Sequence, residues 1–275
     1  MINYLNIKVK LFYKNSNLIG DKMSNITEIY YSPSNTTKTV VNQISSNFES
    51  EKTSLNLIAS PKIEKTFNDE DLIIVGMPVF AGRIPKIARE KLELLKGNDT
   101  PAIAVVNYGN RDYDYALYEL KEVLTKNGFK VFAAAAFISH HSLFPGVAIG
   151  RPDSEDIKLI NEFSAKCIEK LENKQLENVE VPGEDAYRDY KNMPIVPFTN
   201  ECKCTFCLEC ITTCPLGAIS EDDPLTIDAN LCDACTACIY ICPEDARSFV
   251  GETYETMNSK FVTNNSERKE GELFL

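Results

Sequence analysis

Nine of the ten cysteines in this 275-residue chain lie between residues 202 and 242, and eight of them form two copies of one pattern. Each copy reads C-x2-C-x2-C-x3-C-P, first over residues 204–215 and again 28 residues later over 232–243. The chain does not begin with a positively charged, apolar leader, so we expect a cytoplasmic protein whose thiols stay reduced. Cysteines clustered in this way then predict metal ligation.

The spacing favours two [4Fe–4S] clusters. Three closely spaced thiolates bind three irons of one cubane from a single loop, and the fourth cysteine, one helical turn later, ligates the cluster of the other copy. Zinc sites commonly use two C-x2-C pairs instead, and a disulfide framework suits a secreted protein. We predict one cluster on Cys204, Cys207, Cys210 and Cys242, and a second cluster on Cys232, Cys235, Cys238 and Cys214.

Outside these ligands the two copies have diverged, since Ile219 of the first corresponds to Arg247 of the second. Cys202 lies outside the repeat, and a substitute ligand, a redox-sensitive thiol and a spectator all remain open for it. Cys167 belongs to an amphipathic helical pattern, so we expect it in the core.

The first two thirds of the chain alternates strand and helix patterns, which predicts a doubly wound parallel α/β sheet of five strands. The strands are expected at 27–32, 55–59, 71–77, 102–107 and 130–138, and the helices at 37–48, 85–96, 113–127 and 154–173. Pro85 suits the first position of a helix, and Asn127-Gly128 is a common stop signal. The longest apolar runs are too short to span a membrane.

The predicted domain order follows from these patterns. Residues 1–22 fit no part of the sheet and are an N-terminal extension, with a native start at Met23 as one interpretation. The sheet domain covers 23–173, a proline-containing linker or strap covers 174–200, the cysteine domain covers 201–250, and a polar tail covers 251–275.

Three loops at the carboxyl ends of the predicted strands have the composition of a ligand site. The first, over residues 32–37, is rich in hydroxyl groups and precedes a helix, so it could bind a phosphate or simply cap the helix. The loops at 78–82 and 107–113 each offer an aromatic ring and a glycine, although Phe80 and Tyr108 could also be ordinary packing residues.

The first loop is similar to the [ST]-x-[ST]-G-x-T phosphate loop of flavodoxins, with Asn35 where glycine is usual. Over residues 24–250 the chain resembles the flavodoxin–ferredoxin fusion proteins, also called flavoferredoxins. The resemblance implies a flavodoxin-like domain that binds FMN, followed by a small α+β ferredoxin-like domain with two [4Fe–4S] clusters. It implies phosphate binding by Ser32, Ser34, Asn35, Thr36 and Thr37, and a flavin ring lined by Pro78, Val79, Phe80, Ala81, Gly82, Asn107, Tyr108, Gly109, Asn110, Arg111 and Tyr113. Arg111 is a candidate to stabilise negative charge on reduced flavin.

The two histidines, His140 and His141, follow the last predicted strand on the same side of the sheet. A proton donor and a structural, loop-capping role are both open for them, and we assign neither as catalytic.

Charge is distributed unevenly along the chain. Residues 1–181 carry 22 basic and 23 acidic side chains, whereas residues 182–275 carry 7 basic and 17 acidic ones. This acidity argues against nucleic acid as a partner and suits a redox protein with a basic docking face, although it could also serve solubility alone.

We predict an electron-transfer protein that passes electrons between a low-potential donor, the clusters and FMN. An FMN-dependent reductase of a quinone, nitro compound or enoate is the alternative, and a redox sensor is a third class. The donor, the acceptor and any homo-oligomer stay open.

Overall fold

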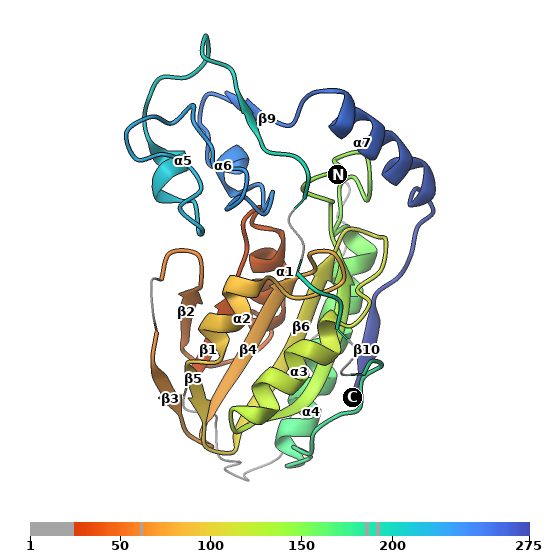
Figure 1. Ribbon diagram of the computed structural model, residues 1–275. Coiled ribbons are helices and arrows are strands. Elements are labelled where there is room, and N and C mark those ends of the chain that lie inside the picture. The colour runs from red at the N-terminus through yellow and green to blue at the C-terminus, as the bar shows by residue number, and fades with distance from the viewer. Residues whose placement is uncertain (1–24, 61–62, 185–186, 191–192) are drawn as a thin grey trace, which may run out of the picture.

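The structure is a computed structural model that describes residues 25–60, 63–184, 187–190 and 193–275. The N-terminal extension predicted at 1–22 lies outside these residues. The centre of the fold is a six-stranded sheet in the order β10-β7-β6-β4-β1-β2 (Figure 1). Five of these strands are parallel, and β10 runs antiparallel to β7.

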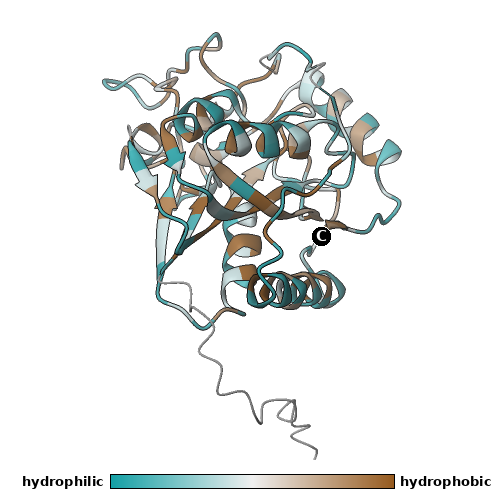
Figure 2. Cartoon of the chain, turned by 90° about the horizontal axis from the view of Figure 1, so that it is seen from below, coloured by the Kyte–Doolittle hydropathy of each residue, from teal (hydrophilic) through white to brown (hydrophobic). Residues whose placement is uncertain are grey.

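The five parallel strands and the four predicted helices are present close to their expected positions. They are β1 (Asn25–Tyr30), α1 (Thr36–Ser45), β2 (Lys52–Asn56), β4 (Asp71–Pro78), α2 (Lys86–Leu92), β6 (Thr100–Tyr108), α3 (Ala116–Lys126), β7 (Phe129–Ile138) and α4 (Ser154–Glu172). Because both faces of such a sheet are covered, its strands are apolar throughout, and every residue of β6 is buried. Figure 2 shows these hydrophobic strands between the layers of helices.

Two hydrophobic cores lie on opposite faces of the sheet. α2 and α3 cover one face, with Leu92 and Leu120 fully buried there. α1 and α4 cover the other, where Val41 and Phe163 are fully buried. Cys167 belongs to this second core and is 0% exposed, as its helical pattern predicts.

Some predicted boundaries are wrong. The helix expected at 85–96 ends at Leu92, and Leu95–Gly97 forms a strand, β5, that pairs with β3 (Lys65–Phe67). Pro85 precedes the helix with an extended ψ of 135°, so it is the residue before the first helical position. The stop signal after α3 is confirmed, because Gly128 takes the left-handed φ of 88° that favours glycine.

A small cysteine module (residues 198–250) lies beyond one end of the sheet (Figure 1). It contains β8 (Phe198–Thr199), α5 (Glu209–Thr212), α6 (Ala237–Tyr240) and β9 (Arg247–Ser248), and β8 pairs antiparallel with β9.

The segment expected as a polar tail forms regular structure instead. α7 (Glu252–Asn264) leads away from the module, and β10 (Glu272–Phe274) returns to the edge of the sheet, as Figure 1 shows. A three-residue strand is too short to produce a readable alternation, and the register is set by β7, where Glu272 pairs with Ala136.

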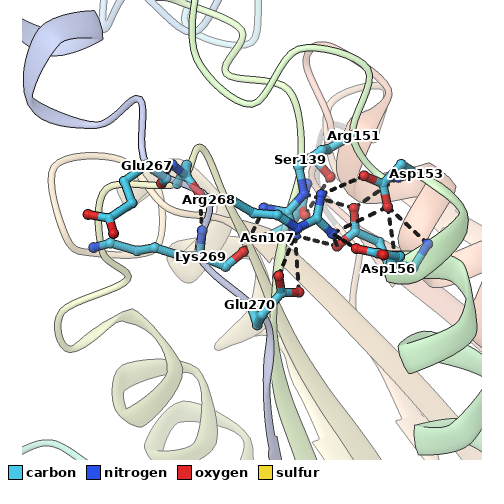
Figure 3. Close-up of polar contacts among 11 residues, drawn as sticks. Asn107, Ser139, Arg151, Asp153, Asp156, Glu267, Arg268, Lys269 and Glu270 are labelled. Carbon is cyan, nitrogen blue, oxygen red and sulfur yellow. Dashed lines mark hydrogen bonds and ion pairs between the residues drawn. The ribbon is translucent and has the colours of Figure 1, made fainter.

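Polar contacts hold the returning chain in place (Figure 3). Arg268 Nη1 donates to Asp153 Oδ2 at 2.6 Å, and the buried Arg151 donates through Nε to Asp156 at 2.8 Å and through Nη1 to the Lys269 carbonyl at 2.7 Å. The cysteine module is therefore connected to the sheet domain by the chain on both of its sides. Among the described residues, none of the helices is both long enough and apolar enough to cross a membrane.

Candidate functional site

The candidate site begins where the strand order reverses. From β1 the chain passes to β2 on one side of β1 and then to β4 on the other side, and doubly wound sheets bind ligands outside the strand ends at such a point. The parallel order β2-β1-β4-β6-β7 is the 2-1-3-4-5 order of the flavodoxin-like fold.

The hydroxyl-rich loop after β1 leads directly into α1. Asn35 has a φ of 63°, so this asparagine takes the left-handed conformation for which glycine is usual at its position. Ser32 Oγ accepts from the Lys38 amide at 3.0 Å, and the hydroxyls of Ser34 and Thr36 lie 3.2 Å apart. The first-turn amides of a helix have no partner within the helix. This loop therefore presents N–H and O–H donors at the positive end of α1.

A cavity of about 370 Å³ opens at this end of the sheet. The structure brings together at its wall most of the residues predicted for a flavin: Ser34, Thr36, Thr37, Pro78, Val79, Phe80, Ala81, Gly82, Asn107, Tyr108, Gly109 and Arg111. Arg111 forms an ion pair with Asp114 across one turn.

Four predicted residues do not line the cavity. Ser32 and Asn35 instead shape the loop, as described above. Asn110 Nδ2 donates to the carbonyls of Asn265 and Glu267 at 2.8 and 2.7 Å. The Tyr113 hydroxyl donates to Glu272 Oε2 at 2.8 Å. Asn110 and Tyr113 therefore bind the C-terminal segment, an interaction that their own neighbourhood in the sequence does not reveal.

Glycine is required where the loops approach each other. A Cβ on Gly109 would lie 2.3 Å from the Cδ2 atom of His141, so any larger residue would displace the histidine ring. Gly82 has a φ of 86°, and a Cβ there would meet the Asp114 side chain. These glycines keep the cavity wall formed by the two loops closely packed.

His141 has a structural role in this wall. Its Nδ1 accepts from the amides of Leu143 and Phe144 at 3.2 and 3.1 Å, which places the proton of the neutral ring on Nε2. Burial, followed by the neighbouring His140 and Arg111, lowers the pKa of His141 to about 4. The ring is therefore neutral near pH 7 and caps the loop.

His140 and His141, expected on this side of the sheet, line the cavity with their neighbours in Ser139–Phe144. Sequence reasoning missed the part of the wall that comes from more distant segments. Phe261 of α7 contributes, as do Asp189, Tyr190 and Met193 of the strap. The cysteine module contributes Leu216, Asn230, Leu231, Asp233, Ala234 and Cys235. None of these carries a recognisable motif for a flavin site, because they meet only through the packing of the module on the sheet domain.

The strap is held by a buried ionic network. Glu119 is 0% exposed, accepts from Arg83 at 2.5 Å and from Arg89 at 2.9 Å, and also accepts from the Tyr190 hydroxyl at 3.0 Å. The guanidinium carbon of Arg83 lies 3.7 Å from the centre of the Tyr190 ring. This network fixes Tyr190 at the edge of the cavity.

The eight repeat cysteines surround two further small cavities. One, of about 20 Å³, is lined by Cys204, Cys207, Cys210 and Cys242. The other, also about 20 Å³, is lined by Cys214, Cys232, Cys235 and Cys238. The structure thus groups the cysteines crosswise, with the fourth cysteine of each copy beside the first three of the other.

The backbone of the module repeats with the cysteines. Phe206, Leu208 and Gly217 have positive φ values of 56°, 64° and 61°, and the residues 28 positions later, Ala234, Thr236 and Asp245, have φ values of 58°, 73° and 46°. Cys214 Sγ accepts from the Ala218 amide, and Cys242 Sγ accepts from the Ala246 amide, each at 3.3 Å. The two copies are therefore the same structural unit.

The repeat cysteines form no disulfide in the structure. All ten cysteines are free. Within residues 25–60, 63–184, 187–190 and 193–275, no three Cys, His, Asp or Glu side chains are close enough together to hold one metal ion. A cubane spreads its four thiolates over four irons, so its ligands stand farther apart than those of one zinc ion.

The two halves of the site meet at Cys235. This cysteine lines both the large cavity and the second cysteine cavity. Tyr31, which follows β1, is 0% exposed, and its hydroxyl has no hydrogen-bond partner among the described residues. Burial raises the pKa of Tyr31 well above its usual range, and the nearby Cys235, Asp233 and Cys214 raise it further. A thiol is a weak acceptor, whereas a metal-bound thiolate is a strong one.

The sequence matches to known proteins include a ferredoxin. No family model matches the chain. A 50-residue stretch is 40% identical to Ferredoxin-2 of Chlorobaculum tepidum, covering 16% of this chain and 81% of that ferredoxin.

Solved structures match the other part of the chain. A short-chain flavodoxin associated with a bacterial microcompartment has a TM-score of 0.41 at 13% identity, covering 54% of this chain and 99% of its own. A rubredoxin oxygen:oxidoreductase from the anaerobe Desulfovibrio gigas has a TM-score of 0.38 at 15% identity, covering 57% and 38%. These scores are low, so the fold assignment rests on the strand order. The chain therefore belongs to the ferredoxin family through its cysteine-rich part, which is fused behind a domain of flavodoxin topology.

Proposed function

We propose that this protein is an electron-transfer iron–sulfur flavoprotein. In this proposal each crosswise set of four cysteines holds one [4Fe–4S] cluster, and the 370 Å³ cavity holds FMN. When bound, such clusters exchange single electrons, and a flavin exchanges one or two. The observation that carries the proposal is the shared wall at Cys235, which joins a cluster site to the flavin cavity without an intervening layer of protein.

The chain's own residues support FMN in two ways. Donors at the N-terminus of α1, with Thr36 and Thr37 at the cavity wall, suit a phosphate group. Phe80, in the loop after β4, and Tyr108, the last residue of β6, line the cavity and offer aromatic surface to a flat ring system.

From the shared wall we also infer an order for the two cluster sites. The second set (Cys214, Cys232, Cys235, Cys238) lies next to the flavin cavity, and we call it the proximal site. The first set (Cys204, Cys207, Cys210, Cys242) is the distal site, and its Cys207 is exposed. Electrons then pass between a donor protein, the distal site, the proximal site and the flavin.

The surface around the distal site fits a protein partner. Phe206 and Leu208, on either side of Cys207, are 54% and 43% exposed. Glu209 and Glu244 border the same cysteine cavity and are exposed. Apolar contact surrounded by acidic groups favours a partner with a basic face, and we expect electron transfer to slow as salt rises.

Anaerobic purification followed by stopped-flow reduction tests this order. In the variant Cys207→Ser, which removes a ligand of the distal site, reduction of the flavin by a reduced low-potential ferredoxin should slow strongly, while photochemical reduction of the flavin should remain. Cys202→Ser, the neighbouring exposed cysteine outside the repeat, is the matched control. Equal flavin reduction rates in C207S and C202S would contradict the order.

One observation favours a second function. Ser139–Phe144, Met193 and Phe261 extend the cavity beyond the predicted flavin loops. A small organic acceptor could bind in this part of the cavity, beside the flavin ring. In this case the protein is an FMN-dependent reductase supplied by its own clusters. Steady turnover of a quinone, nitro compound or enoate with a reduced donor, and no further protein, distinguishes the reductase from the carrier.

A further inference from the structure

Arg247 is a buried cation inside an acidic module. It lies on β9, where it pairs with Thr199 of β8, and it is 4% exposed. The only other basic residue between 198 and 250 is Lys203, which is exposed. The Arg247 side chain borders the distal cysteine cavity, and its Nη2 donates to the Pro224 carbonyl.

The charge of Arg247 lacks a carboxylate partner. No aspartate or glutamate forms an ion pair with it among the residues that the structure describes, and its Nη1 has no acceptor there. A guanidinium stays protonated, and a buried charge without a counter-charge is strongly unfavourable. We therefore expect an anionic group beside Arg247 in the assembled protein.

The neighbours of Arg247 are cysteines of both ligand sets. Arg247 and Cys210 of the distal site both line the distal cysteine cavity. β9, which carries Arg247, packs against α6, which carries Cys238 of the proximal site. Cys210 and Cys238 also belong to one buried cluster. Arg247 therefore lies beside a ligand of each site.

The internal repeat allows Arg247 to be compared with its counterpart in the other copy. The equivalent position in the first copy is Ile219, which is 3% exposed and packs with Ile211 and Ile227. One copy keeps an apolar residue, and the other places a cation at the same point of the same structural unit.

We propose that Arg247 is a positioning residue that serves as the shared counter-charge of the two clusters and raises both of their reduction potentials. The proposal rests on the proposed function, since it requires clusters at both sites. Each one-electron reduction moves one electron from the donor onto one cluster and adds one negative charge there, while Arg247 keeps its proton. A fixed positive charge nearby stabilises the reduced form, and burial protects that effect from screening by salt.

The test is a potentiometric titration of the anaerobically purified full chain, with the two clusters followed by EPR. At a fixed electrode potential, R247Q should lower the ratio of reduced to oxidised cluster at both sites by about tenfold, which corresponds to about 59 mV for a one-electron couple. R247K, which keeps the charge, should lie close to the wild type. K203Q removes the same charge from an exposed position of the same module and should shift neither potential comparably.

The outcomes separate this inference from the proposed function. A wild-type protein without iron–sulfur signals refutes the proposed function itself. Wild-type signals with potentials that R247Q leaves unchanged overturn only the role of Arg247. If R247Q does not assemble its clusters but R247K does, the role of Arg247 as a counter-charge is supported. If R247Q and R247K have the same cluster content and the same potentials, that role is overturned.

Discussion

Thr37 offers the sharpest test of the phosphate loop. It lies in the first turn of α1, lines the cavity and is 1% exposed. Thr37→Val replaces the hydroxyl with a methyl group of the same shape and leaves the packing of the methyl near Gly76 in place. The variant should therefore fold as the wild type does and lose one hydrogen-bond donor to a phosphate dianion.

The expected loss follows from the charge of the acceptor. A hydrogen bond to a charged group contributes about 1.5–3 kcal/mol. At about 1.4 kcal/mol per tenfold change, T37V should raise the Kd for FMN by roughly 10- to 150-fold. Titration of the flavin-free protein with FMN, followed by quenching of flavin fluorescence, measures this Kd.

Two controls isolate the phosphate. Thr39→Val removes a hydroxyl from the same helix, but that hydroxyl donates to the Asn35 carbonyl at 3.0 Å and is exposed, so FMN binding should hardly change. Riboflavin lacks the phosphate, and its Kd should be the same in T37V and the wild type. Equal losses for FMN and riboflavin, or no loss for either, would refute the assignment of the loop.

Three other predictions concern residues around the site. Tyr31→Phe should lower the potential of the proximal cluster and leave the distal one unchanged, because the buried Tyr31 hydroxyl is near Cys235 and a hydrogen bond from it to the metal-bound thiolate would raise that potential. EPR-monitored titration measures both potentials, and equal shifts at both sites would contradict this prediction. Glu119→Gln should lower the free energy of unfolding by about 3–5 kcal/mol, because it leaves the buried Arg83 without its counter-charge. Glu93→Gln, which removes an exposed ion pair, should lower it by under about 1 kcal/mol. Urea unfolding measures both values. The pKa of His141 is lowered to about 4 in the folded protein, so the unfolded chain binds a proton at a higher pH than the folded chain does. The stability that the neutral His141 ring contributes is therefore complete above about pH 6.5 and is lost as the pH falls towards 4. In His141→Gln the free energy of unfolding should depend less on pH over this range.

The parallel sheet could be predicted because its signals are local. Long apolar strands such as β4 and β7 alternate with amphipathic helices, and turn residues such as Asn127 and Gly128 mark the boundaries. β5 and β10 could not be predicted, because each has only three residues and owes its strand conformation to a partner elsewhere in the chain.

In the candidate site, too, local features could be predicted and contacts between distant segments could not. The crosswise grouping of the cysteines follows from spacing within one short segment, and the structure brings the same sets together. Asn110 and Tyr113 follow the same strand end as Tyr108, yet they contact the C-terminal segment, which returns from more than 150 residues away in the chain. The contributions of Tyr190, Phe261 and Cys235 to the cavity depend on how the strap, α7 and the module pack, and no local pattern encodes that packing.

The most direct test of the central claim is an analysis of iron, acid-labile sulfide and flavin in the anaerobically purified protein. Two [4Fe–4S] clusters and one FMN predict about eight irons, about eight sulfides and about one FMN per chain. Zinc in place of iron, about four irons or fewer, or no bound flavin would contradict the account.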